Sequence, residues 1–373
     1  MKQNWQIKKL KDICEKGSSN VNMKDLTDLQ GEYPIYGASG LIKNVNFYHQ
    51  EKEYIGIIKD GSGIGRTMLL QPKSSVIGTL QYILPKEGNL IQFINYALQS
   101  LDLTKFKQGA AIPHIYFKDS GETEIVVPPL ADQRRIVAIL DAKFTQIDAL
   151  KATAQKNLDN AEQLWKAKLE KEFGNKEWKM TKLGEVCEIT DGDHLPPPKS
   201  ESGFPFITIS DIDKDAYKIK FDNTFFVPET YFKGLKDNKK PKRGDVLYTV
   251  TGSYGIPVLV DGEREFCFQR HIGLIRPIKS INSKFLFYWI LNPETKKIAD
   301  EVATGTAQKT VSLKSLRNFT IPIPPLAEQT AIVSRLDALS AQISELKTKY
   351  RRQIECCDEL RQSLLRAAFE GEM

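Results

Sequence analysis

Apolar residues recur at spacings of three and four along two long stretches, residues 136–169 and 332–368; the positions on these stripes include Leu150, Leu346 and Leu360. No Pro or Gly interrupts either stretch before Gly174 and Gly371. This periodicity predicts two helices of about 40 residues, each roughly 60 Å long. Because a lone helix cannot bury a narrow apolar stripe, we expect the two helices to pack on each other as an antiparallel, coiled-coil-like pair.

The pattern changes in the segments before each helix, about residues 15–127 and 188–323. Short alternating runs rich in Val, Ile, Tyr, Phe and Gly replace the helical spacing there. Alternation with a period of two predicts twisted sheets joined by long loops. The apolar segments 93–98 (FINYAL) and 285–291 (FLFYWIL) fit either short helices or buried strands. Each half of the chain is therefore expected to be an α/β globule followed by a helical arm, which together make a mixed α+β fold.

Both helical stretches start with nearly the same sequence. VPPLADQRRIVAILDA at 127–142 and IPPLAEQTAIVSRLDA at 323–338 are identical at ten of sixteen positions, with an offset of 196. Weaker matches relate WQIKKLKDICE (5–15) to WKMTKLGEVCE (178–188), YIGIIKDGSGIG (54–65) to VLYTVTGSYG (246–255), and KQGAAIPHI (107–115) to TGTAQKTV (304–311). Such long self-similarity predicts an internal pseudo-twofold duplication and disfavours the alternative of two unrelated amphipathic helices.

The duplication divides the chain into four parts with definite boundaries. These are a first globular region (1–127), a central helical region (128–177), a second globular region (178–323) and a C-terminal helical region (324–373). The frame is shared by the two copies, whereas the contents of the two globular regions differ.

Composition narrows the class of protein. With 41% hydrophobic and 27% charged residues the chain is an ordinary globular protein. It has no secretory signal pattern and no apolar run near the roughly 20 residues of a membrane helix, so we expect a cytoplasmic protein without membrane contact. The five cysteines form no CxxC pair and the four histidines show no metal-ligand spacing, so no metal site is expected. The net charge of +6 is mild, but it is clustered, as in KGLKDNKKPKR at 233–243. Clustered positive charge favours a polyanionic partner.

Candidate contacts to a nucleic acid lie in both globular regions. In the first, small residues of KDGSGIGR let a backbone come close to a ligand, and basic residues follow; these candidates are Lys59, Ser62, Arg66, Lys105, Lys107 and Gln108. In the second, DGDHLPPPK presents polar groups on a stiff proline-rich loop, KKPKR supplies phosphate clamps, and QRH offers side chains that pair with base edges. The candidates are His194, Lys199, Lys239, Lys240, Lys242, Arg243, Thr251, Ser253, Tyr254, Gln269, Arg270 and Lys309.

Each of these candidates also has a plain structural explanation. The proline-rich loop could be a surface connector, the basic run could be merely solvated, and Arg270 could form a structural salt bridge. The sequence does not choose between the explanations.

Two other classes of function stay open at this point. The GSGIG cluster at 61–65 superficially resembles the glycine loops of S-adenosylmethionine sites, as in a DNA methyltransferase. Such a loop needs a following helix, but RTMLL after it is typical of a strand, and Asn292-Pro293 is followed by Glu294, so the chain lacks an NPPY-like tetrapeptide. A coiled-coil scaffolding protein would explain the helices but not two divergent globular regions with basic loops.

The doubled PPLA[DE]Q helix start and the doubled Trp…Leu…Cys-Glu opening resemble the specificity subunit of type I restriction-modification systems. That resemblance covers the whole chain and implies two target-recognition domains, each reading one half of a bipartite, asymmetric sequence in double-stranded DNA. It also implies that the helices set the spacing of the two halves and dock two methyltransferase subunits, and through them restriction subunits. Catalysis and cofactors are implied to belong to those partners.

Overall fold

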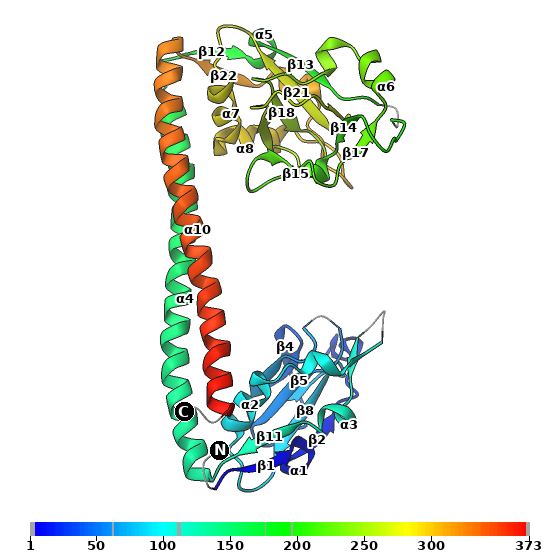
Figure 1. Cartoon of the computed structure of the whole chain (residues 1–373), viewed down its shortest axis with the longest axis vertical. Helices are drawn as coiled ribbons and strands as arrows, with labels where there is room; N and C mark the ends of the chain where they lie inside the picture. Colours follow the sequence, from blue (N-terminus) through cyan, green and yellow to red (C-terminus); the bar gives the residue numbers. More distant parts are fainter. Residues whose placement is uncertain (1–3, 62, 110–112, 176, 195–196, 371–373) are drawn as a thin grey trace. The chain divides into compact units, whose positions relative to one another are not determined.

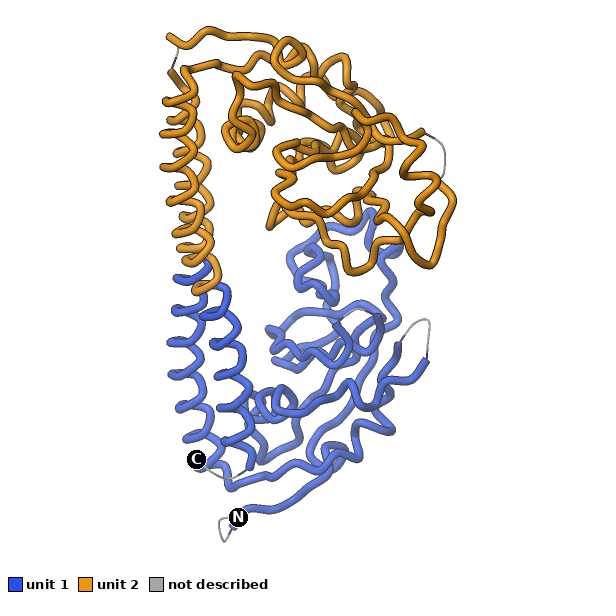
Figure 2. The backbone as a smooth tube through the Cα atoms, turned by 45° about the horizontal axis from the view of Figure 1, so that its top comes forward, with its two compact units in different colours: residues 1–155, 351–373 blue, residues 156–350 orange. Residues whose placement is uncertain are grey.

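Residues 4–61, 63–109, 113–175, 177–194 and 197–370 are described by the computed structural model of the chain. The chain forms two compact units, unit 1 from residues 1–155 and 351–373 and unit 2 from residues 156–350 (Figure 2). Each unit contains one globular region and a part of both long helices.

The two predicted long helices are confirmed as α4 (Leu130–Phe173) and α10 (Leu326–Glu370) (Figure 1). Pro128-Pro129 and Pro324-Pro325 precede them, and the carbonyls of Pro129 and Pro325 accept hydrogen bonds from the first turn of each helix. Proline suits this position because its missing N–H would have no partner in the helix.

In both units α4 and α10 run antiparallel. In unit 1 Lys151 pairs with Asp358 at 2.6 Å and Arg361 with Asp148 at 3.1 Å. In unit 2 Lys347 pairs with Glu162 at 3.1 Å. Each step forward on α4 is matched by one step back on α10, which confirms the predicted direction of packing.

Three leucines assigned to the apolar stripes are nevertheless exposed, so that part of the prediction was wrong. Leu150, Leu346 and Leu360 expose 51%, 38% and 49% of their surface, and Leu164 exposes 55%. Two packed helices cover only a narrow stripe of each other, and residues at its margin stay in solvent. Ala154 of α4 and Leu365 of α10, by contrast, are fully buried.

The strands of unit 1 are β1 (Gln6–Lys9), β2 (Cys14–Ser18), β3 (Tyr33–Gly37), β4 (Gly40–Val45), β5 (Tyr54–Ile58), β6 (Thr67–Leu70), β7 (Ser75–Val76), β8 (Leu80–Pro85), β9 (Lys107–Gln108), β10 (His114–Ile115) and β11 (Glu124–Val127). Its short helices are α1 (Leu10–Ile13), α2 (Ile91–Ser100) and α3 (Phe117–Ser120). The larger sheets have the orders β2-β8-β5-β6 and β4-β3-β7, and β3 pairs with β7 in parallel.

The strands of unit 2 are β12 (Lys179–Lys182), β13 (Cys187–Asp191), β14 (Phe204–Ile207), β15 (Ile212–Asp213), β16 (Lys218–Ile219), β17 (Phe225–Val227), β18 (Val246–Thr249), β19 (Pro257–Leu259), β20 (Cys267–Phe268), β21 (Ile272–Pro277) and β22 (Thr320–Ile323). Its short helices are α5 (Leu183–Val186), α6 (Glu229–Gly234), α7 (Ser283–Leu291), α8 (Pro293–Val302) and α9 (Leu313–Arg317). The sheet orders are β13-β21-β18-β19 and β17-β14-β20, with β14 and β20 parallel.

The four-stranded and three-stranded sheets of the two units have the same topology, so the duplication seen in the sequence extends to the fold. Even the register is kept, because Cys14 lies opposite Pro85 and Cys187 opposite Pro277. The ambiguous segments FINYAL and FLFYWIL are helices, α2 and α7, at equivalent places.

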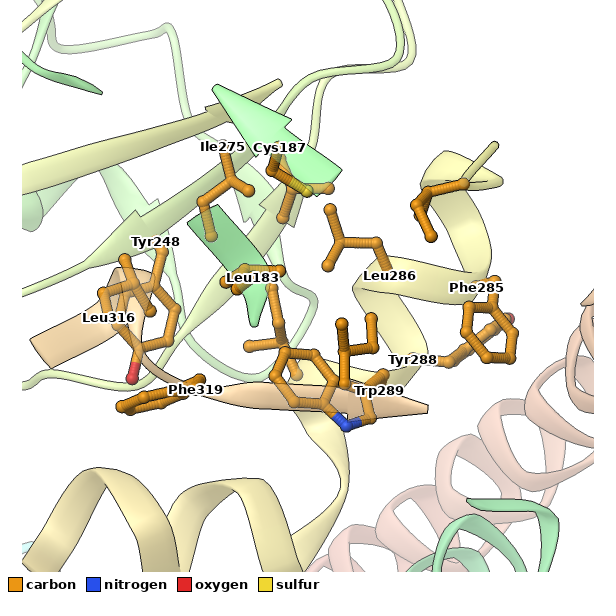
Figure 3. Packing of buried hydrophobic residues seen from close by; sticks show 14 of the residues in the cluster. Leu183, Cys187, Tyr248, Ile275, Phe285, Leu286, Tyr288, Trp289, Leu316 and Phe319 are labelled. Carbon is orange, nitrogen blue, oxygen red and sulfur yellow. The ribbon is translucent and has the colours of Figure 1, made fainter. Parts of the chain in front are cut away.

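One face of the four-stranded sheet is buried against a helix in each unit. In unit 2, Tyr248 and Ile275 of the sheet pack with Leu286 and Trp289 of α7, as Figure 3 shows, and Leu336 of α10 belongs to the same cluster. In unit 1 the corresponding layer contains residues of the sheet, of α2 and of both long helices, among them Ile57, Phe93, Leu140 and Leu365. Burying each such side chain contributes roughly 1.5–3 kcal/mol. Through this buried layer each globular region packs against the long helices.

Candidate nucleic-acid interface

The glutamine of the doubled PPLA[DE]Q motif is buried in both units. Gln133 accepts a hydrogen bond from the Leu90 N–H at 2.8 Å, and its amide donates to the carbonyls of Pro128 at 3.0 Å and Gly88 at 3.3 Å. It therefore ties the first turn of α4 to the segment that leads into α2.

Gln329 repeats this arrangement in unit 2. It accepts from the Asn282 N–H at 2.8 Å and donates to the carbonyls of Pro324 and Ser280, both at 3.0 Å. One conserved side chain in each copy thus links a long helix to the globular region beside it.

An aspartate near the end of the 16-residue repeat, Asp141 in the first copy and Asp337 in the second, makes a second link. The Tyr96 hydroxyl donates to Asp141 in unit 1, and the Tyr288 hydroxyl donates to Asp337 at 2.6 Å in unit 2. Burial and the hydrogen bond to Asp337 raise the pKa of Tyr288, so this tyrosine stays protonated and keeps donating. The repeated sequence therefore encodes the attachment of two sheets to two helices.

The glycine loop of the first globular region lies against the β9–β10 hairpin. The Gly61 N–H donates to the Pro113 carbonyl at 3.2 Å, and the Ile115 N–H donates to the Lys59 carbonyl at 2.9 Å. Since β9 contains Lys107 and Gln108, the fold brings these candidates together with Lys59 although about 50 residues separate them. The loop continues into strand β6, as predicted, so it lacks the helix of a nucleotide-binding loop.

Other candidates of the first globular region have local partners. Arg66 donates to the carbonyls of Gly63 and Ala38, both at 3.3 Å, and its guanidinium fills the space that a Cβ at position 63 would need. Gln108 donates to Asp119 at 2.9 Å, and the Lys105 ammonium lies 5.1 Å from the Phe106 ring centroid. Ser62 lies outside the described residues.

The second globular region joins its loops with the same backbone contacts. The Gly252 N–H donates to the Lys309 carbonyl at 2.9 Å, and the Val311 N–H donates to the Val250 carbonyl at 2.8 Å. The fold thereby brings Thr251 and Lys309 together, with Ser253 in the same loop. Tyr254 is held by α8, because its hydroxyl donates to Asp300 at 2.8 Å and the Lys296 ammonium lies over its ring in a cation–π contact.

The DGDHLPPPK segment is tied to two distant loops. The Lys239 ammonium donates to the Gly192 carbonyl at 3.0 Å, and Asp193 forms a backbone bridge with Gln269. A Cβ on Gly192 would lie 2.0 Å from the Phe268 carbonyl oxygen, so only glycine fits here. His194 contacts Asp191 at 2.8 Å, while Leu195 and Pro196 lie outside the described residues. His194, Lys239 and Gln269 are therefore neighbours of one loop.

The QRH turn connects this cluster to the Thr251 loop. The Val250 N–H donates to the His271 carbonyl at 2.9 Å, and Arg270 donates to the His271 ring at 3.4 Å. A structural salt bridge, the alternative considered for Arg270, is not among its interactions with the described residues. The Lys199 ammonium lies 5.0 Å from the Phe225 ring centroid.

The KKPKR run is partly neutralised by its own surroundings. Lys242 pairs with Asp237 at 2.6 Å and lowers the pKa of that carboxyl group. Arg243 pairs with Glu263 at 3.4 Å, and the Lys240 ammonium lies 5.3 Å from the Phe232 ring centroid. These exposed pairs are weak, so a phosphate could replace the carboxylates.

Sequence reasoning missed several polar residues at these loops. Asp60 and His114 pair at the junction of the first globular region, and Tyr231 donates to Asp193 at 2.8 Å in the second. Only the alignment of the two repeats could have drawn attention to positions 60 and 114. Both fall within segments that match between the copies, yet their residue types differ there.

A duplicated frame that carries two differently composed loop clusters defines a class of protein, one that recognises two ligands with one architecture. The model of the type I restriction modification DNA specificity domain family matches residues 2–159 and 175–356, and the chain belongs to this family. The resemblance noted in the sequence is thereby confirmed.

Known relatives agree along the full length of the chain. The MjaVIII specificity subunit of Methanocaldococcus jannaschii is 26% identical over 95% of this chain and 90% of that protein. A solved chain from work on assembly and conformational transition of the type I R-M system has a TM-score of 0.76 at 21% identity, with 100% and 99% of the two chains covered. The HsdS subunit of Thermoanaerobacter tengcongensis has a TM-score of 0.55 at 20% identity, with 100% and 98% covered. The last two likenesses show a shared fold.

None of the helices in the described part of the chain is long and apolar enough to span a bilayer.

Proposed function

We propose that the chain is the DNA-recognition subunit of a type I restriction-modification complex. The first globular region (1–127) reads one half of a bipartite, asymmetric target in double-stranded DNA, and the second (178–323) reads the other half. The central (128–177) and C-terminal (324–373) helical regions set the gap between the halves. The observation that carries this proposal is the pair of loop clusters, which share backbone contacts but differ in side chains.

Two equivalent apolar surfaces on the helices support docking of two copies of one partner. In unit 1 Leu150 of α4 and Leu360 of α10 are exposed, and Lys151 of α4 pairs with Asp358 of α10. The repeat offset of 196 carries Leu150 onto Leu346, and applied backwards it carries Leu360 onto Leu164; both are exposed in unit 2. The same operation carries the Lys151–Asp358 ion pair onto that of Lys347 with Glu162.

Two equivalent surfaces are expected where two copies of one protein bind with pseudo-twofold symmetry. We assign these surfaces to two methyltransferase subunits, through which restriction subunits join the complex. The complex acts on chromosomal DNA in the cytoplasm, and the chain itself binds no cofactor.

The first test is co-expression with a methyltransferase subunit of the same system, followed by sequencing of methylated adenines in the host DNA. We expect one bipartite motif, and no methyl transfer by the purified chain alone. Exchanging residues 15–127 for those of a relative should change one half of the motif only. Methyl transfer by the lone chain, or a change in both halves, would contradict the proposal.

A second test addresses the docking surfaces. Replacing Leu150 and Leu360 with Asp should reduce the number of methyltransferase subunits per chain from two to one, measured by native mass spectrometry. The matched control is Leu41→Asp, a leucine on β4 that is at least as exposed as Leu150 and Leu360. Retention of two subunits would move the docking site away from these leucines.

A further inference from the structure

In each unit the glycine loop pairs with a second loop, and we call the place where they pair the loop junction. The two loop junctions share a backbone arrangement but have different side-chain pairs at their centre. In unit 1 Asp60 and His114 form an antiparallel bridge, and the Asp60 carboxylate contacts His114 Nδ1. In unit 2 Thr251 and Thr310 occupy the equivalent bridge, and their hydroxyl oxygens are 3.3 Å apart. The backbone bonds on either side of the bridge are the same in both units, as described above.

The residue types of these pairs are not shared by the two copies. Positions that attach each globular region to a long helix, such as Gln133 and Gln329, carry the same residue in the two copies and make equivalent hydrogen bonds. The bridge positions keep their place in the backbone, yet they carry a charged, aromatic pair in one copy and two small hydroxyls in the other. Two domains that share a backbone but bind different sequences must differ in the side chains that contact the ligand, and the bridge positions differ in this way.

The bridge residues are also accessible. The Asp60 and His114 side chains expose 24% and 26% of their surface, and the two threonines are likewise partly exposed. The His114 ring lies 4.1 Å from the ring of Tyr116, a contact that restrains the imidazole. Among the described residues, the contact with His114 engages Asp60 Oδ1 and leaves Oδ2 without a hydrogen bond.

We propose that the pair Asp60–His114 reads one base pair of the first half-site and the pair Thr251–Thr310 one base pair of the second. This inference rests on the proposed function. A carboxylate accepts from the exocyclic amino group of cytosine or adenine, so the first pair should select a base with that group. A threonine hydroxyl tolerates several partners, and its methyl group favours contact with the thymine methyl.

The test is selection from a randomised duplex library by the full chain in complex with its methyltransferase subunits. The wild-type complex should select a bipartite motif. The variant D60T/H114T should change one position in one half and leave the other half and the gap intact. The reverse variant T251D/T310H should change one position in the other half.

Failure of the two proposals is distinguishable. A wild-type complex that selects no bipartite motif contradicts the proposed function itself. A wild-type bipartite motif that the D60T/H114T variant also selects, at unchanged affinity, overturns the assignment of these residues alone.

A gentler variant decides the matter if the double variant does not fold by near-ultraviolet circular dichroism. Asp60→Asn keeps the size of the side chain but replaces one acceptor with a donor. On duplexes with single-base changes it should lower discrimination at one position by at least about tenfold. The control Asp28→Asn, an exposed aspartate in the segment before β3, should change no position. An equal loss of affinity for all sequences would mean that Asp60 only positions the loops, and the proposal would fall.

Discussion

Removal of the Gln133 side chain should loosen the attachment of one globular region and not of the other. In Gln133→Ala the Leu90 N–H loses its acceptor, and the carbonyls of Gly88 and Pro128 lose a donor. A net hydrogen bond contributes about 1 kcal/mol, and a buried group left without a partner costs about 1–3 kcal/mol. Because water can reach part of the site after truncation, we expect a loss of about 3 kcal/mol.

Native-state hydrogen exchange followed by mass spectrometry measures this loss in each unit separately, because each unit yields its own peptides. A loss of about 3 kcal/mol corresponds to roughly 150-fold faster exchange for amides whose exchange rate is proportional to the equilibrium constant of opening. Peptides of α2 should show this acceleration in Gln133→Ala, whereas peptides of α7 should exchange as in the wild type. Gln329→Ala should give the opposite pattern, since it makes the equivalent bonds in unit 2.

The matched controls are Gln146→Ala on α4 and Gln342→Ala on α10, two exposed glutamines of the same helices. Each should change stability by less than about 0.5 kcal/mol. If Gln133→Ala accelerates exchange no more than Gln146→Ala does, the glutamine is not an anchor, and the repeat of the motif needs another explanation.

Three further outcomes are expected. Burial alone would raise the pKa of Glu172, but Arg335 and Lys168 outweigh burial and lower that pKa. The ionised Glu172 therefore stabilises the fold above the ordinary glutamate pKa of about 4.3, and this stabilisation is lost as the pH falls below it. Arg335→Met should reduce the fall in urea midpoint between pH 6 and pH 3. Four residues inserted after Ala154 shift the register of α4 against α10 by about 6 Å, so this single insertion should prevent assembly of the complex. Four more residues inserted after Glu355 restore the register. The complex with both insertions should methylate sites with a gap longer by one or two base pairs. Alanine at all four basic positions of KKPKR should flatten the slope of log K against log salt by roughly 0.9 per lost phosphate contact, and an unchanged slope would leave that run without a role in binding; these positions are Lys239, Lys240, Lys242 and Arg243.

Much of the fold is readable from the sequence because its signals are local. The spacing of apolar residues and the absence of Pro and Gly predict α4 and α10 nearly to their ends, since a helix depends on neighbours three and four positions away. The run RTMLL after the glycine loop predicts strand β6, and self-similarity alone reveals the duplication. Short apolar runs such as FLFYWIL carry no such signal, and the packing of α7 on the sheet decides that this run is a helix.

The composition of the candidate interface was decided by tertiary structure. The sequence singled out the glycine loops and the basic runs, because their residue types are unusual in themselves. It did not reveal that Asp60 contacts His114, or that Lys239 donates to the Gly192 carbonyl, because each contact joins segments about 50 residues apart. Nor did it show that Leu150 lies outside the helix contact, since the margin of an apolar stripe depends on where the second helix lies. Local periodicity determines elements, whereas the pairing of distant segments determines which side chains face a ligand.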